Sequence, residues 1–207
     1  MNGMIGKKIG MTSAFSPDGR LVPVTVVQVG PCVVTQVKTI EKDGYTAVQL
    51  GFDEKPVERL SRPVAGHLKK ACDKGFRVLK EFRTHTVDGV EPGATVNLDM
   101  FAIGEKVTVS GTSKGRGFQG TIKRHGFSRG PETHGNRNHR KPGSIGNSAW
   151  PAKVIKGKRM PGHMGVDRET VKNLTIVDIK HKDNLLLLRG AVPGPKTGIL
   201  EIHKTDK

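Results

Sequence analysis

Hydrophobic residues along this chain of 207 residues recur mainly at every second position, in short runs. Residues 21–29 read LVPVTVVQV, and β-branched side chains at both sets of alternate positions are typical of a strand buried on both faces. In residues 45–52 the side chains that share one face at period two are Thr46, Val48, Leu50 and Phe52. Further segments that predict strands are residues 32–37, 76–82, 96–100, 107–109, 174–179, 185–188 and 199–202.

Turn signals separate these runs. Asp18-Gly19 and Asp43-Gly44 are dipeptides that favour tight turns, and residues 193–198 combine Pro and Gly. Short strands with such turns predict a mainly β fold, either a barrel or a sandwich. One short helix is expected near residues 64–73, because three apolar side chains there fall on one face and Gly75 follows as a stop.

The charge of the chain adds a function to this predicted β fold, namely the binding of a charged partner. Lys and Arg number 35 against 19 Asp and Glu, which gives a net charge of +16 and implies a polyanionic partner. No run approaches the ~18 apolar residues of a membrane-spanning helix, and the N-terminus lacks the apolar stretch of a secretory signal. A cytoplasmic protein without a membrane association is therefore expected.

Two cysteines, Cys32 and Cys72, are too few for a disulfide framework. Their spacing is not that of a CxxC redox motif. We therefore interpret them as two small buried thiols.

The positive charge is concentrated in residues 111–166. This segment holds twelve Lys or Arg and one acid, Glu132, together with 12 of the 27 glycines. A connection of this length between two strands is far beyond the usual ~2–6 residues, and such loops are usually functional. The sequence thus predicts a β-barrel domain from residues 1–110 and 167–207, with an extended basic loop inserted between its strands.

Glycines beside cations suit the binding of phosphate. A Lys or Arg supplies positive charge, and a backbone amide next to Gly can approach an anion because no Cβ obstructs it. Aromatic and His side chains add flat faces on which unpaired bases stack. The candidate nucleic-acid-binding residues are Lys114, Arg116, Lys123, Arg124, His125, Arg129, His134, Arg137, His139, Arg140, Lys141, Trp150, Lys153, Lys156, Lys158, Arg159 and His163.

Catalytic and metal-binding interpretations of the same segment are weaker. Residues 115–120 spell GxGxxG, but Gly126 and Gly130 interrupt the helix that a dinucleotide site requires. The four His have no Cys nearby, one carboxylate within the segment and no HExxH spacing, so no metal is expected. No GxSxG elbow is present, and a segment with one carboxylate is unsuited to general acid–base chemistry. An amphipathic helix on a membrane surface is excluded by the glycines and prolines.

Several long motifs resemble one known family, the universal large-subunit ribosomal protein three, in its compact bacterial form. They cover nearly the whole chain and are GKKIGMT at 6–12, SKGRGFQG at 113–120, RKPGSIG at 140–146, KGKRMPGHMG at 156–165 and NLLLLRGAVPG at 184–194.

The resemblance implies a barrel of the translation-protein type and a long loop that reaches through large-subunit (23S-type) rRNA toward the peptidyl-transferase centre. It implies early binding to rRNA during assembly, contacts with neighbouring large-subunit ribosomal proteins, and no catalysis, cofactor or small-molecule substrate. The loop tip would be near residues 146–151, with Trp150 closest to the catalytic RNA. Some relatives carry a methylated glutamine there, whereas residues 147–150 read NSAW and contain none.

Two other functions stay open at this point: a free-standing RNA chaperone, and an RNA-processing enzyme that uses the loop to hold its substrate. Whichever of these functions applies, the basic loop lacks a hydrophobic core of its own. It is predicted to be mobile in the free protein and to become ordered on RNA.

Overall fold

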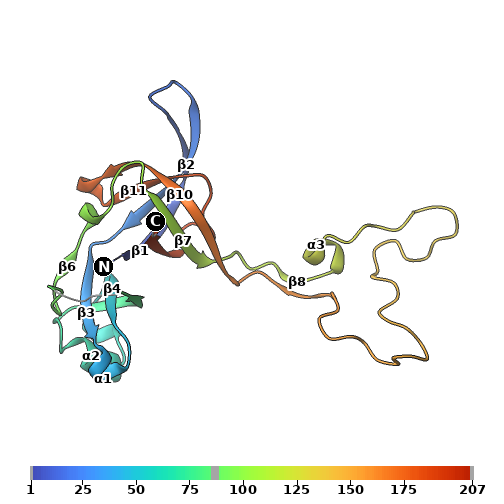
Figure 1. The fold of residues 1–207 in the computed structure, drawn as a ribbon, viewed down its shortest axis with the longest axis horizontal. Helices are drawn as coiled ribbons and strands as arrows, with labels where there is room; N and C mark the ends of the chain where they lie inside the picture. Colours follow the sequence, from blue (N-terminus) through green and yellow to red (C-terminus); the bar gives the residue numbers. More distant parts are fainter. Residues whose placement is uncertain (1, 85–88, 206–207) are drawn as a thin grey trace. The chain divides into compact units, whose positions relative to one another are not determined.

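The computed structural model describes residues 2–84 and 89–205, and it confirms a mainly β fold built on a closed six-stranded barrel (Figure 1). Residue 1, residues 85–88 and residues 206–207, which the sequence assigns to the barrel domain, lie outside the described residues. In their order around the barrel the strands are β1 (Gly3–Phe15), β12 (Ile199–Lys204), β7 (Lys106–Thr112), β10 (Arg168–Lys180), β11 (Leu185–Arg189) and β2 (Leu21–Val29).

A second, four-stranded sheet follows β2 in the chain. Its strand order is β5 (Gly75–Arg83), β4 (Ala47–Lys55), β3 (Cys32–Lys38) and β6 (Thr95–Val96). The short helices outside the inserted segment are α1 (Ile40–Asp43), η1 (Val57–Arg59), α2 (Arg62–Leu68), η2 (Leu98–Met100) and η3 (His181–Asp183).

The barrel core forms where the β-branched and leucine runs face one another. All barrel neighbours pair antiparallel, with Leu186 opposite Val27 and Ile202 opposite Val109. These four side chains are fully buried in one continuous core that also includes the inner face of the four-stranded sheet. Burial of such side chains stabilises the fold by about 1.5–3 kcal/mol each relative to exposure.

One cation lies within this apolar region. Lys8 is buried on β1, and its Nζ donates hydrogen bonds to the carbonyl oxygens of Val192, at 2.9 Å, and Gly194, at 3.1 Å. A buried charge is costly unless it is hydrogen-bonded. Lys8 therefore fastens the loop before β12 to β1.

The sequence patterns did not reveal β1 as a strand. Its 13 residues contain Lys7, Lys8 and three glycines, which interrupt the period of two. Its register also shifts between Lys8 and Gly10, as at a β-bulge. Strand β1 nevertheless pairs with β2 as far as Phe15 opposite Leu21, across a turn in which Gly19 has a φ of 74°.

Two further expectations differ from the structure. Residues 96–100 form only the end of β6 and the 3-10 helix η2, so the strand prediction is wrong there. Leu98 reaches the core from a turn that the Phe101 amide closes onto the Leu98 carbonyl, at 2.9 Å. Helix α2 spans Arg62–Leu68 rather than 64–73, because a proline in its first turn favours an early start.

Both cysteines are free thiols. Cys32 is buried, as expected, whereas Cys72 is half-exposed. Burial raises the pKa of Cys32 to about 11, and the protonated thiol donates a hydrogen bond to the Ile5 carbonyl oxygen at 3.6 Å. Cys32 is therefore a protonated core residue at neutral pH.

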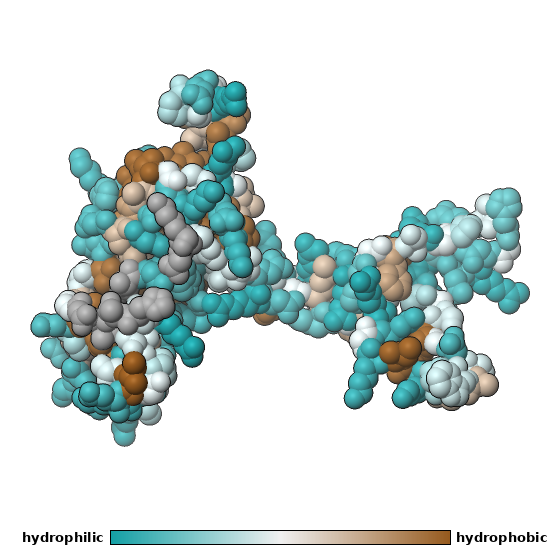
Figure 2. Space-filling model, viewed as in Figure 1, coloured by the Kyte–Doolittle hydropathy of each residue, from teal (hydrophilic) through white to brown (hydrophobic). Residues whose placement is uncertain are grey.

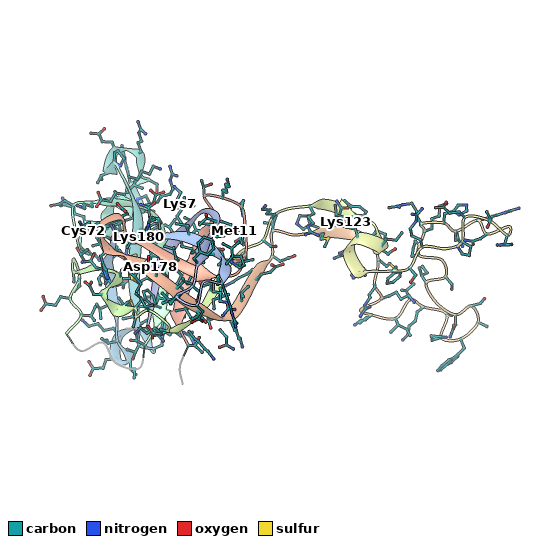
Figure 3. The ribbon with its side chains drawn as sticks, turned by 90° about the horizontal axis from the view of Figure 1, so that it is seen from above. Lys7, Met11, Cys72, Lys123, Asp178 and Lys180 are labelled. Atoms are coloured by element: carbon teal, nitrogen blue, oxygen red, sulfur yellow. The ribbon has the colours of Figure 1, made fainter. Side chains whose placement is uncertain are left out.

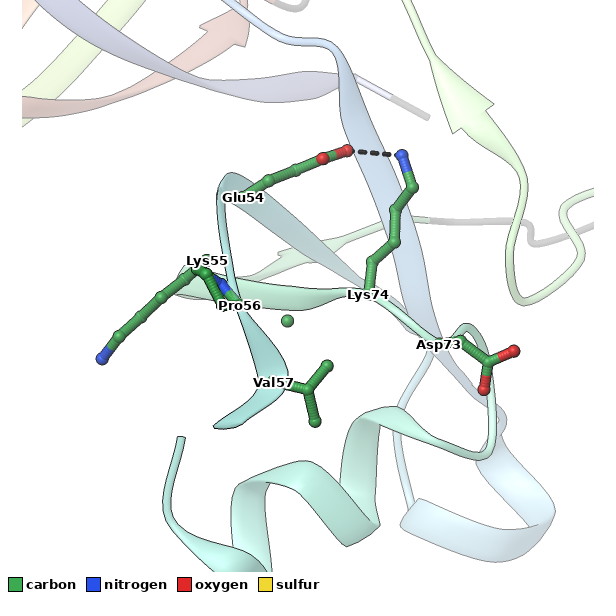
Figure 4. Close-up of a pocket in the computed structure, with 7 residues that line it drawn as sticks. Glu54, Lys55, Pro56, Val57, Asp73 and Lys74 are labelled. Carbon is green, nitrogen blue, oxygen red and sulfur yellow. Dashed lines mark hydrogen bonds and ion pairs between the residues drawn. The ribbon is translucent and has the colours of Figure 1, made fainter. Parts of the chain in front are cut away.

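A shallow pocket of about 350 Å³ lies where β4 ends and β5 begins (Figure 4). Across it, Lys74 Nζ and Glu54 Oε1 form an ion pair at 2.6 Å. This bond raises the pKa of Lys74. Both side chains are more than half exposed, and such surface pairs add little stability. We therefore interpret this ion pair as a local contact between the end of β4 and the start of β5.

Contacts divide the chain into two compact units. One comprises Met1–Thr112 with Arg168–Lys207, and the other comprises Ser113–Asp167. The boundary follows the β7–β10 ladder, whose last pair is Thr112 opposite Arg168. We refer to Ser113–Asp167 as the insertion unit.

Candidate nucleic-acid interface

The insertion unit begins with a short paired stem, defined here as residues 113–126 and 160–167. The Ser113 amide donates to the Asp167 carbonyl at 2.8 Å, and the Asp167 amide donates to Ser113 Oγ at 3.2 Å. Strand β8 (Gly117–Gln119) then pairs antiparallel with β9 (Gly162–Met164). The two ends of the unit are thus held together by backbone hydrogen bonds.

Gly165 is required by this stem for a steric reason. Its φ is +83°, and a Cβ at this position would lie 2.1 Å from the Lys114 carbonyl oxygen. Only glycine satisfies both conditions without strain. Close approach of the two stem segments therefore depends on the residue type at position 165.

Helix α3 (Thr121–His125) follows β8, and it ends at Gly126, whose φ is +69°. The sequence predicted no helix in this segment, which is wrong for these five residues. Gly126 does act as the expected stop, because it adopts the left-handed conformation of a helix C-terminus. A helix this short escapes detection by periodicity.

Two of the predicted RNA-binding side chains on α3 contact the returning segment. Arg124 Nη1 donates to the Met160 carbonyl at 2.8 Å, and His125 Nε2 lies 3.0 Å from the same oxygen, as donor in the appropriate tautomer. A Cβ at Gly162 would lie 2.5 Å from Arg124 Nη1. Arg124 and His125 are accordingly the half-buried members of the candidate set, and they hold the stem closed.

Beyond the stem lies the outer loop, defined here as residues 127–159. Its described residues contain no helix or strand, and Figure 1 draws them as an irregular trace after α3. One subloop is closed locally. The Gly130 amide donates to the His139 carbonyl at 3.0 Å, and Asn136 Nδ2 donates to the Pro131 carbonyl at 2.8 Å.

The remaining fifteen of the seventeen candidate residues are exposed. Lys114, Arg116, Lys123 and His163 lie on the stem, and Figure 3 shows the Lys123 side chain at α3. The others lie on the outer loop, where Trp150 is 85% exposed. The structure thus distributes the candidates along the insertion unit rather than gathering them into one pocket.

Carboxylates rarely oppose these cations. Among the described residues of the insertion unit, Arg129 is the one candidate that forms an ion pair, with Glu132. The described part of the barrel unit has seven ion pairs, which include Lys38–Glu81 and Lys204–Glu105. The exposed cations of the insertion unit are therefore left to interact with groups outside the chain.

The described residues offer neither a metal-binding cluster nor a membrane-spanning helix. Within residues 2–84 and 89–205, no three His, Cys, Asp or Glu side chains group as they would around a metal ion. No helix in this part of the chain is long and apolar enough to cross a membrane.

Sequence reasoning missed the residues that position the loop. Ser113, Asp167 and the Met160 carbonyl act through contacts between residues 35 to 54 positions apart. No local pattern encodes such pairs. Gly162 and Gly165 were the one signal in the sequence for the paired stem, because a glycine in or beside a strand indicates that another backbone approaches closely.

The fold and the candidate residues define a class of protein: it is mainly β and has a separate unit rich in exposed cations. Comparison with known proteins gives a family. The family model for ribosomal protein L3 matches residues 78–185.

Curated relatives match over nearly the whole chain. The protein named large ribosomal subunit protein uL3 from Desulforapulum autotrophicum is 67% identical over 98% of each chain. Proteins of the same name from Desulfatibacillum aliphaticivorans and Alkaliphilus metalliredigens are 55% and 51% identical, over 98% and 100% of this chain and 96% and 99% of theirs. The chain belongs to the ribosomal protein L3 family.

Proposed function

We propose that this protein is a structural constituent of the large ribosomal subunit and that the exposed cations of its insertion unit bind large-subunit rRNA. Membership of the ribosomal protein L3 family supports the first part. The observation that carries the second part is the set of exposed cations in Ser113–Asp167, of which only Arg129 forms an ion pair among the described residues. Neighbouring proteins of the same subunit are the expected protein partners.

The proposed mechanism is neutralisation of phosphate charge where rRNA segments crowd together. Lys and Arg side chains of the insertion unit replace counterions on the RNA backbone, and release of those counterions favours binding. Arg offers a planar fork to phosphate or to a guanine edge, whereas Lys supplies a point charge. Exposed His and Trp side chains provide faces for unpaired bases.

The seventeen candidates divide into two roles in this proposal. Arg124 and His125 position the loop, because their side chains already contact the Met160 carbonyl. The remaining fifteen contact RNA directly. Arg124 still has guanidinium donors beyond the bond to Met160, so a phosphate contact from the same side chain is compatible with its positioning role.

Sedimentation of a cell lysate tests this function. The wild-type chain is compared with a variant in which residues 114–165 are replaced by a short Gly-Ser linker. We expect the wild type to co-sediment with large subunits and to stay bound in moderately high salt. The variant, which keeps the barrel ladders, should dissociate at lower salt or accumulate in incomplete subunits.

A wild-type chain that stays at the top of the gradient would overturn the ribosomal assignment. Binding to many single-stranded RNAs would then favour the chaperone, and RNA turnover would favour the processing enzyme. The family membership favours neither alternative.

A further inference from the structure

Strands β1 and β2 continue beyond the barrel as a two-stranded ribbon. Strand β12 pairs with β1 only at Gly3–Lys7, and β11 pairs with β2 at 24–28, yet β1 and β2 pair with each other as far as Phe15 and Leu21. Figure 1 shows this ribbon in blue, leaving the barrel beside the β2 label. Apart from a hydrogen bond that the Gly190 amide donates to the Pro23 carbonyl at 2.9 Å, residues 10–15 and 21–23 are therefore paired only within the ribbon, among the described strands.

One face of the ribbon continues the row of side chains that points into the barrel. Val27 belongs to the core and Thr25 is buried, and residues two apart on a strand share a face. The register places Met11 opposite Thr25 and Phe15 opposite Leu21, with Pro23 between them on β2. The inward-facing row thus extends past the point at which the barrel ends.

Apart from Ser13, a small polar residue opposite Pro23, the side chains of this continuing row are apolar and exposed. Phe15 is 76% exposed, Leu21 61% and Met11 52%, and Pro23 is exposed too. We call these four residues the ribbon stripe. Figure 2 shows brown surface where the ribbon joins the barrel, below a tip coloured white and teal, and Figure 3 labels Met11 on the barrel unit.

The chemistry of the ribbon stripe favours a protein partner over RNA. RNA binding in this chain would use cations and flat faces, as on the insertion unit. The stripe has no charged member, and Phe15 is its one aromatic side chain. Met, Leu and Pro side chains gain most from contact with other apolar side chains.

The size of the stripe indicates what kind of protein partner fits. Exposed apolar patches of roughly 300–600 Å² are often functional, and a patch of four side chains is on the order of a few hundred Å². A stable interface between two free proteins needs about 800 Å² on each partner, so a second copy of this chain is disfavoured. A small patch suffices when both partners are held on the same scaffold, because their effective concentration is high.

We propose that the ribbon stripe packs into an uncharged, apolar groove on a neighbouring protein of the large subunit. This inference rests on the proposed function, because the shared rRNA holds the two proteins together. The opposite face of the ribbon, which includes Thr12 and Ala14, does not take part.

Photo-crosslinking within purified large subunits tests the contact. Phe15 is replaced by the photoreactive amino acid benzoylphenylalanine, and Thr12, exposed on the opposite face, receives the same group as a matched control. We expect position 15 to crosslink to one ribosomal protein, at an apolar segment, with several-fold higher yield than position 12. Crosslinks from position 15 to rRNA, or to a second copy of this chain, would overturn the proposal.

Oxidation of Met11 by dilute peroxide supplies a second measurement, followed by mass spectrometry of the wild-type protein. Met11 should oxidise readily in the free protein and several-fold more slowly in the large subunit, whereas buried Met4 is slow in both. Equal oxidation of Met11 in both states would show an uncovered stripe and overturn the proposal. These results concern subunits that already contain the chain, so they are distinguishable from failure of the proposed function, which appears as absence of co-sedimentation.

Discussion

The barrel unit and the insertion unit satisfy their side chains in opposite ways. In the described part of the barrel unit, apolar side chains bury one another, and six Lys or Arg pairs with carboxylates and one His–Asp contact are formed. In the insertion unit, most side chains are exposed and one ion pair serves twelve Lys and Arg. The barrel unit therefore satisfies its core and many of its charged side chains internally, whereas the insertion unit carries charge that its own side chains do not balance.

The largest expected effect is a difference in stability loss when an isoleucine is truncated in the barrel unit and in the insertion unit. Ile202→Ala removes a fully buried barrel side chain and should lower the free energy of unfolding by about 2–5 kcal/mol. The matched change Ile155→Ala, at an outer-loop residue that is 68% exposed, should alter it by less than about 0.5 kcal/mol. Urea unfolding followed by circular dichroism measures both. Equal losses would contradict the division into a packed and an unpacked unit.

A smaller, local effect is expected at the stem. Gly165→Ala forces a Cβ against the Lys114 carbonyl at a positive φ, which costs on the order of 1–3 kcal/mol. Hydrogen exchange of the Arg116 amide, which bonds to the Met164 carbonyl at 2.9 Å, should speed up, while barrel amides stay protected.

Gly120→Ala is the control for that experiment, because its φ is ordinary and a Cβ would meet open space. It should leave exchange at Arg116 unchanged. If Gly165→Ala also leaves that exchange unchanged, the stem is not held by the close approach described here.

The smallest effect concerns an ion pair on the surface of the barrel unit. The hydrogen bond from Lys38 holds the pKa of Glu81 below its usual range, and a hydrogen bond from Tyr45 adds to this lowering. The same bond to Glu81, with one to Tyr45, raises the pKa of Lys38 above its usual range. A carboxylate with a depressed pKa stabilises the fold above its unfolded pKa, and this contribution is lost as pH falls through the folded pKa.

Glu81→Gln should therefore lose less stability on acidification than the wild type does, as measured by thermal unfolding at pH 7 and pH 3. Glu58→Gln, at an exposed carboxylate without an ion pair among the described residues, serves as control and should follow the wild type. A Glu81→Gln profile parallel to that of the wild type would show that this pair contributes nothing to the pH dependence.

The barrel was predictable because its strands follow simple patterns. Strand β2 matches the β-branched run at residues 21–29, and β11 and β12 match the leucine and isoleucine runs near the C-terminus. Strand β1 was missed because lysines and glycines interrupt its pattern, although hydrogen bonds satisfy Lys8 inside the fold. Residues 96–100 alternate like a strand, yet Leu98 reaches the core from a turn.

The candidate interface was predictable only in its composition. Charge counting located the cations, because their density changes sharply near residues 111 and 166. It did not separate positioning residues from contact residues, since the bonds of Arg124 and His125 to the Met160 carbonyl depend on the folded stem. That the exposed cations contact rRNA stays a prediction, as does the order that the loop gains on RNA.

The central claim is that the cations of the insertion unit, rather than those of the barrel unit, neutralise rRNA phosphates. The most direct measurement is the slope of log K against log salt concentration for binding to large-subunit rRNA. The wild type is compared with a Lys153, Lys156 and Lys158→Gln triple variant, and with a matched Lys42, Lys69 and Lys70→Gln variant of exposed barrel-unit lysines.

Each lost phosphate contact should make the slope shallower by about 0.7–0.9. The account predicts a shallower slope and weaker binding for the insertion-unit variant, with wild-type values for the barrel-unit variant. A wild-type slope for the insertion-unit variant, or equal changes in both variants, would contradict it.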